Sequence, residues 1–85
     1  MFLLQTERQI FDFLYSQSDF VSEKLVIKLF TRSKFRVAPL LGIYYKRRLI
    51  ESKTFNGHRM CRLTERGKRV VDLLIELEKL LKGED

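Results

Sequence analysis

Apolar residues recur at helical spacing in four stretches of the chain. The first stretch opens with a Thr-x-x-Gln capping box at Thr6, and its apolar residues are Ile10, Phe11, Phe13 and Leu14. This pattern predicts a helix over residues 6–16, which ends at the polar stretch of residues 16–19. Phe20 and Val21 are too few to assign alone, although a brief strand fits them.

The second and third stretches are separated by a predicted turn at residues 31–33. Ser22 is a favourable N-cap, and the apolar face of the helix that it begins consists of Leu25, Val26, Leu29 and Phe30. The third helix is predicted over residues 34–47, and the residues expected on its core side are Val37, Leu41 and Tyr44. Pro39 cannot donate a backbone hydrogen bond. Either this helix begins near Val37, or Pro39 lies in a first turn whose donors are unpaired anyway; the second arrangement, with a kink, is favoured.

Between residues 49 and 63 the pattern changes to that of a β-hairpin. Asn56-Gly57 is the strongest short signal for a two-residue type I′ turn, because both central residues of that turn need positive φ. The strands are then residues 49–55 and 58–63. Their predicted cross-strand pairs are Phe55–His58, Thr54–Arg59, Lys53–Met60, Ser52–Cys61 and Glu51–Arg62. In this register the residues on the core face are Ile50, Cys61 and Leu63.

The fourth stretch predicts a long helix that begins after an N-cap at Thr64 and ends at Gly83. Its apolar residues cover an arc of roughly 220° at 100° per residue. A helix on a single domain core needs a stripe of only about 100°. The excess predicts a homodimer with the following interface residues: Phe2, Leu3, Leu4, Val70, Leu73, Leu74, Leu77, Leu80 and Leu81.

The composition indicates which class of partner the chain binds. The chain has 85 residues, which is the size of one domain, and a net charge of +6, which favours an anionic partner such as nucleic acid or an acidic membrane surface. A single cysteine excludes an internal disulfide and fits a reducing compartment. Neither a signal peptide nor a membrane span is visible, so a cytoplasmic protein is expected.

No catalytic or metal-binding pattern is visible in the sequence. His58 and Cys61 are three residues apart on a predicted strand, where they point to opposite faces and cannot share one ion. Cys61 is interpreted as a small core residue, with an intersubunit disulfide as the alternative. With one histidine, one cysteine and no glycine-rich phosphate loop, the chain is expected to be neither an enzyme nor a cofactor-binding protein.

Two short motifs at the ends of the hairpin resemble those of winged helix-turn-helix proteins. Arg48-Leu49-Ile50-Glu51 stands where such proteins usually have Gly-Leu-Ile-Glu, and residues 63–67 resemble the Leu-Thr-x-x-Gly of MarR-like and PadR-like regulators. The whole chain is similar to small single-domain versions from archaea and their viruses. The resemblance implies a mainly α fold with a β-hairpin (α+β). Residues 22–47 would be the helix-turn-helix, residues 49–63 the wing and residues 64–82 the dimerisation helix.

The resemblance also implies a function, namely a homodimeric DNA-binding transcriptional regulator. The third helix would enter the major groove, and the wing would lie on the backbone or in the minor groove. The candidate DNA contacts are Lys34, Arg36, Pro39, Lys46, Arg47, Lys53, His58 and Arg59. Arg36 is the candidate base reader because arginine pairs bidentately with guanine, whereas Lys34, Lys46 and Arg47 are candidate phosphate contacts.

One departure from this pattern keeps other functions open. The middle of the third helix, APLLGIYY, has no Asn, Gln, Ser or Thr that could read base edges. A sequence-neutral architectural DNA-binding protein is therefore one alternative. A winged-helix module that docks another protein is the second. No residue argues for a small-molecule effector.

Overall fold

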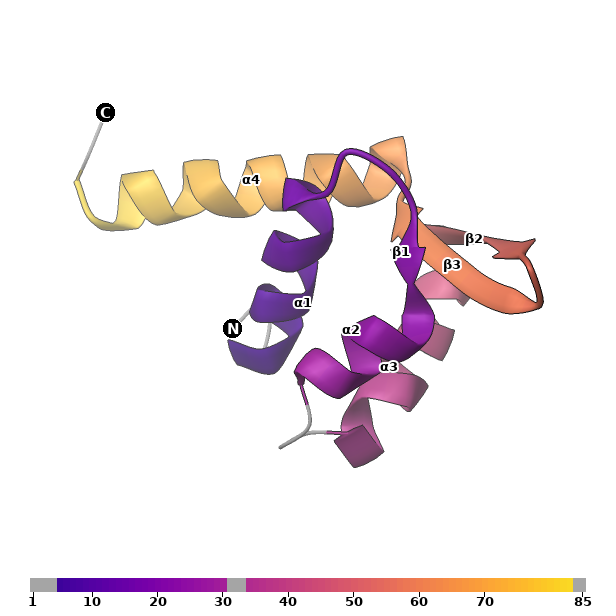
Figure 1. Ribbon diagram of the computed structural model, residues 1–85. Coiled ribbons are helices and arrows are strands. Elements are labelled where there is room, and N and C mark those ends of the chain that lie inside the picture. Colours follow the sequence, from indigo (N-terminus) through magenta and orange to yellow (C-terminus); the bar gives the residue numbers. More distant parts are fainter. Residues whose placement is uncertain (1–4, 31–33, 84–85) are drawn as a thin grey trace.

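The computed structural model describes residues 5–30 and 34–83. Within these ranges the chain forms four helices and three strands (Figure 1). In chain order they are α1 (Gln5–Ser16), β1 (Val21–Ser22), α2 (Glu23–Leu29), α3 (Lys34–Lys46), β2 (Ile50–Phe55), β3 (His58–Leu63) and α4 (Glu65–Leu81). The predicted α+β class is confirmed, and the bounds differ from the predicted ones by about one residue, which is the usual uncertainty of an element end. The turn predicted at residues 31–33 lies outside the described residues.

The sheet contains the expected two-stranded wing and a third strand, which lies within one residue of the brief strand that was left open at Phe20 and Val21. It has three strands in the order β1-β3-β2, because β1 pairs antiparallel with the free edge of β3 through Val21↔Cys61 and Ser22↔Met60. This pairing satisfies backbone groups that an edge strand would leave open. The hairpin register is the predicted one at every position from Glu51↔Arg62 to Phe55↔His58. Asn56 and Gly57 have φ values of 49° and 76°, as a type I′ turn requires.

The predicted caps are confirmed at three helix ends. The Ser22 hydroxyl accepts from the Leu25 N–H at 3.3 Å, and the Thr64 hydroxyl accepts from the Gly67 N–H at 3.0 Å. Gly83 follows the C-cap of α4 with a φ of 75°.

Two expectations about helix starts are wrong. Thr6 lies inside α1, which already includes Gln5, because the spacing of a capping box also occurs within a first helical turn. Pro39 is the sixth residue of α3, counted from Lys34, so it lies in the second turn. There its ring takes the place of the backbone N–H that would have donated a hydrogen bond to the Phe35 carbonyl. The helix forms nevertheless, since Val37 and Leu41 bury its inner face on either side of the proline.

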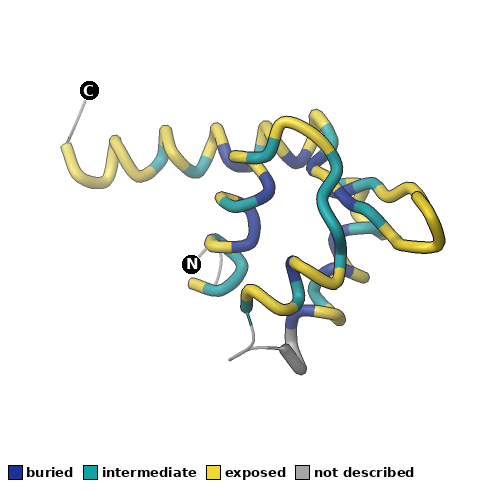
Figure 2. The backbone as a smooth tube through the Cα atoms, viewed as in Figure 1, coloured by how far each residue is buried: buried dark blue, intermediate teal, exposed yellow. Residues whose placement is uncertain are grey.

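The core draws residues from every element except the short β1 strand, and Figure 2 shows it where α1, α3, the sheet and the start of α4 meet. Tyr44 is 4% exposed, and its ring lies 4.9 Å from that of Phe11 between centroids. The predicted inner faces of α3 and of the hairpin are confirmed. The buried residues are Ile10, Phe11, Leu14, Val26, Val37, Leu41, Tyr44, Ile50, Cys61, Leu63 and Val71.

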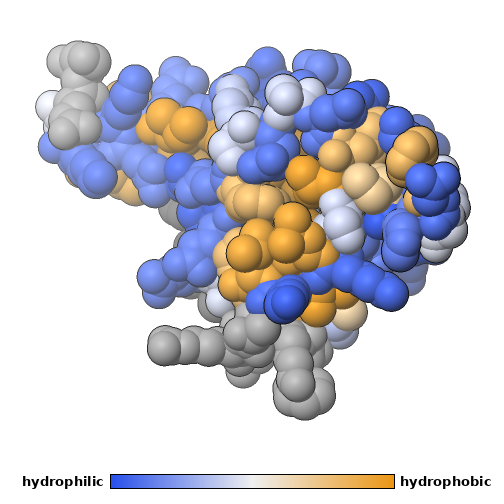
Figure 3. All heavy atoms as spheres, in the orientation of Figure 1, coloured by the Kyte–Doolittle hydropathy of each residue, from blue (hydrophilic) through white to orange (hydrophobic). Residues whose placement is uncertain are grey.

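The apolar face predicted for α2 is only partly correct. Val26 is buried, but Leu25 and Leu29 are 44% and 52% exposed. At 100° per residue, Leu25 lies about 100° and Leu29 about 60° from Val26, both on the same side of it. The rotation of α2 that buries Val26 leaves these two leucines at the outer edge of the buried stripe. They contribute to the apolar surface that Figure 3 shows over α2.

Helix α4 begins beside the sheet, crosses α1 and continues beyond it, so that its C-terminal half extends from the rest of the molecule (Figure 1). Two contacts join it to α1: the Tyr15 hydroxyl donates to Asp72 at 2.6 Å, and Arg8 pairs with Glu78 at 2.8 Å. Beyond these contacts its surface includes the exposed residues Leu80 and Leu81. In the described residues no helix is long and apolar enough to span a membrane.

Candidate nucleic-acid interface

The outward face of α3 is apolar in its middle and basic at its end. Among the residues whose burial is described, the exposed ones are Ala38, Pro39, Gly42, Ile43 and Lys46, and Arg47, which directly follows the helix, is also exposed. They recur at i, i+4 and i+8, opposite the buried residues Val37, Leu41 and Tyr44. The side chains of Lys34 and Arg36 lie outside the described part of the structure, so the predicted base reader cannot be placed.

Two adjacent tyrosines fix α3 against the other helices. The Tyr44 hydroxyl donates to Glu7 Oε1 on α1 at 2.8 Å, and the Tyr45 hydroxyl donates to Glu23 Oε2 on α2 at 2.6 Å. Burial, followed by the hydrogen bond to the carboxylate, raises the pKa of both phenols above the ordinary value of 10.0. Both phenols are therefore neutral donors at physiological pH, and they hold α3 from two sides.

The three predicted DNA-contact residues of the wing lie on two different faces of the sheet. Lys53 and His58 share the outer face of the sheet, since His58 stands opposite Phe55 and side chains alternate along a strand. Arg59 points to the inner face, where its guanidinium lies 5.9 Å from the centre of the Tyr45 ring. The side chains of all three residues are exposed, but the structure does not bring them together on one face.

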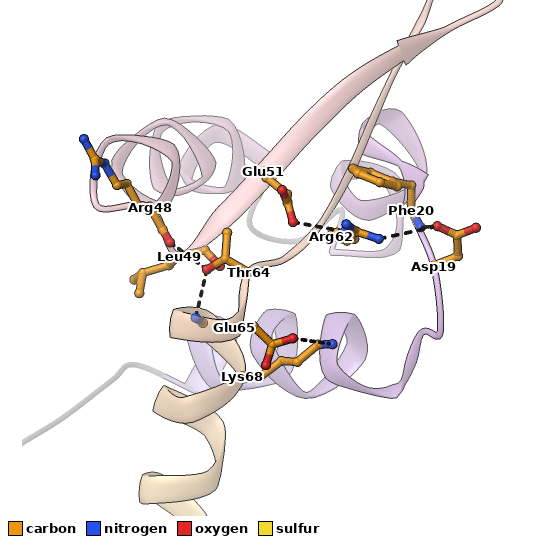
Figure 4. A network of polar contacts seen from close by, with 10 residues as sticks. Asp19, Phe20, Arg48, Leu49, Glu51, Arg62, Thr64, Glu65 and Lys68 are labelled. Carbon is orange, nitrogen blue, oxygen red and sulfur yellow. Dashed lines mark hydrogen bonds and ion pairs between the residues drawn. The ribbon is translucent and has the colours of Figure 1, made fainter.

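The base of the wing is held by an aromatic contact that the sequence did not reveal. The Phe20 ring contacts two cations, with Lys53 Nζ at 4.6 Å and the Arg62 guanidinium at 4.3 Å from its centre. Arg62 also pairs with Glu51 at 3.0 Å and with Asp19 at 3.9 Å (Figure 4). Antiparallel pairing of β1 with β3 places Phe20 opposite Arg62, so recognising this strand pair would have predicted the contact.

The junction between α3 and the wing explains both short motifs. Arg48 has a φ of 59°, a left-handed conformation that glycine adopts more easily, and it occupies the position of the glycine in Gly-Leu-Ile-Glu. The Thr64 hydroxyl donates to the Arg48 carbonyl at 2.6 Å while it caps α4 (Figure 4). A side chain at Gly67 would overlap the Leu49 carbonyl oxygen, so only glycine lets α4 start this close to the wing.

Several cations of this surface have no carboxylate partner among the described residues, as is also true of Lys24 on α2 and of Arg69 and Lys79 on α4. On α1 and α4, Arg8 and Lys68 are paired with carboxylates. Among the described residues, no carboxylate lies within 4.0 Å of Lys46, Arg47, Lys53 or Arg59. These four cations are therefore available to an external anion, whereas the wing cation Arg62 is paired with Glu51 and Asp19.

The single cysteine lies in the core. Cys61 is free and completely buried, and burial raises the pKa of its thiol from 9.0 to about 11. It is therefore a neutral, inaccessible thiol at physiological pH, as its interpretation as a core residue predicted. His58 lies on the opposite, exposed face. In the described residues no three His, Cys, Asp or Glu side chains are placed to hold a metal ion.

The comparisons with known proteins bear on the fold. Neither a protein-family model nor a curated protein matches the sequence. The structure is similar to that of a mutant of S. aureus MepR, a winged-helix protein of the MarR family, bound to an oligodeoxyribonucleotide. The TM-score is 0.72 at 20% sequence identity, and the match covers 98% of this chain but 66% of that one. The expected MarR-like resemblance is thus confirmed at the level of the fold, which is a winged helix.

Proposed function

We propose that the protein is a DNA-binding transcriptional regulator. The observation that carries this proposal is the set of exposed cations on α3 and on the wing that have no carboxylate partner among the described residues. These are the two elements with which a winged helix-turn-helix protein meets DNA. The oligodeoxyribonucleotide bound to the similar MepR structure supports the same partner. No catalytic chemistry or cofactor is part of the proposal.

In this proposal α3 lies in the major groove. Lys46 and Arg47 contact phosphates from its C-terminal end, and Pro39 faces the groove. Lys34 is assigned to a phosphate and Arg36 to a guanine, both on the sequence pattern alone. The wing lies on the backbone or in the minor groove and uses Lys53, His58 and Arg59. DNA can draw Lys53 away from Phe20, because a cation–π contact at an exposed site contributes only about 0.5–1 kcal/mol.

We further propose that two copies bind together through α4. Four of its large apolar side chains are at least 38% exposed: Leu73, Ile75, Leu80 and Leu81. Leu74 and Leu77 also line an open groove of about 310 Å³ between α4 and α1. Apart from Ile75, these side chains together with Val70 are the α4 residues of the seam expected from the sequence. Phe2, Leu3 and Leu4, assigned to the same interface, lie outside the described residues. Such a dimer would place its recognition helices about 34 Å apart, one turn of DNA.

Alanine substitutions on and off the surface test the proposal. Lys46→Ala and Arg59→Ala should each weaken binding to a labelled duplex, measured by fluorescence anisotropy, because each removes an unpaired cation from the interface. Lys79→Ala removes the same charge from an exposed position on α4 and should bind DNA like the unaltered protein. Equal losses in all three variants would show that only net charge matters, and would contradict the assignment of α3 and the wing.

A second candidate function is sequence-neutral DNA binding. It is favoured by the outward face of α3, on which no described side chain between Ala38 and Ile43 is polar. Competition with random DNA separates the two functions, since a regulator prefers its site by a factor of about 10³ or more. If no DNA binds even at low salt, the protein-docking module is left as the function.

A further inference from the structure

We propose that the outward face of α3 recognises thymine methyl groups, so that the protein reads A·T pairs in the major groove by apolar contact. This inference rests on the proposed DNA-binding function and names the class of base pair that it selects. It is carried by the stripe formed by Ala38, Pro39, Gly42 and Ile43.

The stripe is continuous and open. Ala38 and Gly42, like Pro39 and Ile43, are one helical turn apart, so the four residues form one surface. All four are exposed, Ile43 by 42%. A Cβ atom added at Gly42 would meet no atom within 4 Å, so nothing in the described residues covers the middle of the stripe. None of these side chains can donate or accept a hydrogen bond.

The charges beside the stripe indicate that its occupant is a polyanion. One turn beyond Gly42 and Ile43 the same face continues into Lys46 and Arg47, which have no carboxylate partner in the described part of the chain. An apolar strip next to unpaired cations matches the major groove of DNA, where base edges lie between two rows of phosphates. An apolar protein partner would leave these cations unpaired.

Only one group on the edges of the bases in the major groove matches an apolar strip. The thymine C5-methyl is apolar, whereas the other exposed groups are hydrogen-bond donors and acceptors. When apolar side chains cover those groups, the groups lose their hydrogen bonds to water and gain no hydrogen bonds in exchange, which is unfavourable. An A·T pair offsets part of this cost by burying its thymine methyl group, whereas a G·C pair has no methyl group to bury and is disfavoured. The missing side chain at Gly42 lets the helix backbone approach the groove, and Ile43 supplies the methyl groups that contact thymine.

The test replaces thymine by uracil, which lacks only this methyl group. An A·T-rich duplex and its uracil counterpart are titrated with the protein under the same salt. Removing one contacted thymine methyl should weaken binding about fourfold, from the transfer free energy of one buried methylene. Ile43→Ala should reduce this difference between the two duplexes. Leu25→Ala is the matched control, because Leu25 is an exposed leucine of α2 with a similar 44% exposure.

Each outcome decides the inference. The inference is supported if the unaltered protein and Leu25→Ala both bind the uracil duplex more weakly than the thymine duplex. The difference in affinity between the two duplexes should then be smaller for Ile43→Ala. Equal affinity for both duplexes overturns the inference and leaves the proposed function intact. A uracil effect that is unchanged in both Ile43→Ala and the milder Ile43→Val overturns the assignment to α3. Absence of binding to either duplex overturns the proposed function and the inference with it.

Discussion

Arg48 adopts a conformation that its side chain does not favour. Its φ of 59° is left-handed, and for residues other than glycine this costs roughly 1–2 kcal/mol. The neighbouring contacts require it: the Leu49 N–H donates to the Tyr44 carbonyl at 2.9 Å, and Thr64 binds the Arg48 carbonyl. The turn between α3 and the wing is thus determined by its surroundings and not by Arg48 itself.

Replacing Arg48 by glycine should therefore stabilise the protein. We expect Arg48→Gly to raise the free energy of unfolding by about 1 kcal/mol over Arg48→Ala, since both variants lack the charge and only glycine relieves the strain. Urea unfolding followed by circular dichroism measures the difference. Equal stabilities of the two variants would show that the turn is not strained.

Two phenols of α3 and a neighbouring thiol are protonated in the folded protein. Burial and a hydrogen bond to a carboxylate raise the pKa of Tyr44 and of Tyr45 above the ordinary value of 10.0. Burial likewise raises the pKa of the Cys61 thiol above its ordinary value of 9.0. Above about pH 9 the unfolded chain loses protons that the folded chain retains. The stabilising effect of these groups is therefore complete at neutral pH and declines as the pH rises.

The unfolding free energy should accordingly fall above about pH 9. Each group that ionises only in the unfolded chain contributes up to about 1.4 kcal/mol per pH unit. Tyr45→Phe removes one of them, so its stability should fall less steeply in the same titration of urea midpoints against pH. A variant with the same alkaline slope as the unaltered protein would exclude Tyr45 as a contributor.

Local patterns predicted the elements, whereas contacts between distant elements escaped the sequence. Asn56-Gly57 and the caps at Ser22 and Thr64 are local signals, and each was confirmed. A brief strand at Phe20 and Val21 was left open because so few residues carry little signal, and its pairing with β3 was not predicted because the partner lies about 40 residues further along the chain. The contact of Phe20 with Lys53 and Arg62 follows from that pairing, so it was missed for the same reason. Helical spacing also did not show that both leucines of α2 would be exposed.

The exposed leucines at the end of α4 favour a dimer. Leu80 and Leu81 are 66% and 71% exposed on the part of α4 that extends beyond α1 (Figure 2). We expect Leu80→Glu to dissociate the dimer in sedimentation experiments and to weaken DNA binding together with it, because one copy engages only half of a two-fold site. The folded monomer should be unaffected, since Leu80 packs little within it.

Lys79→Glu is the matched control for this prediction. It introduces the same carboxylate one residue away, at a position that is already polar, and should leave both assembly and DNA affinity nearly unchanged. If the unaltered protein sediments as a monomer at micromolar concentration, α4 is not a dimerisation helix.

Binding of double-stranded DNA at a series of salt concentrations tests the central proposal most directly. In two copies Lys34, Lys46, Arg47, Lys53 and Arg59 offer up to ten phosphate contacts. If about six are made, the logarithm of the binding constant should fall against the logarithm of the salt concentration with a slope of about −5. A slope near zero, or no binding at the lowest salt, would contradict the proposal that these cations bind the phosphates of DNA.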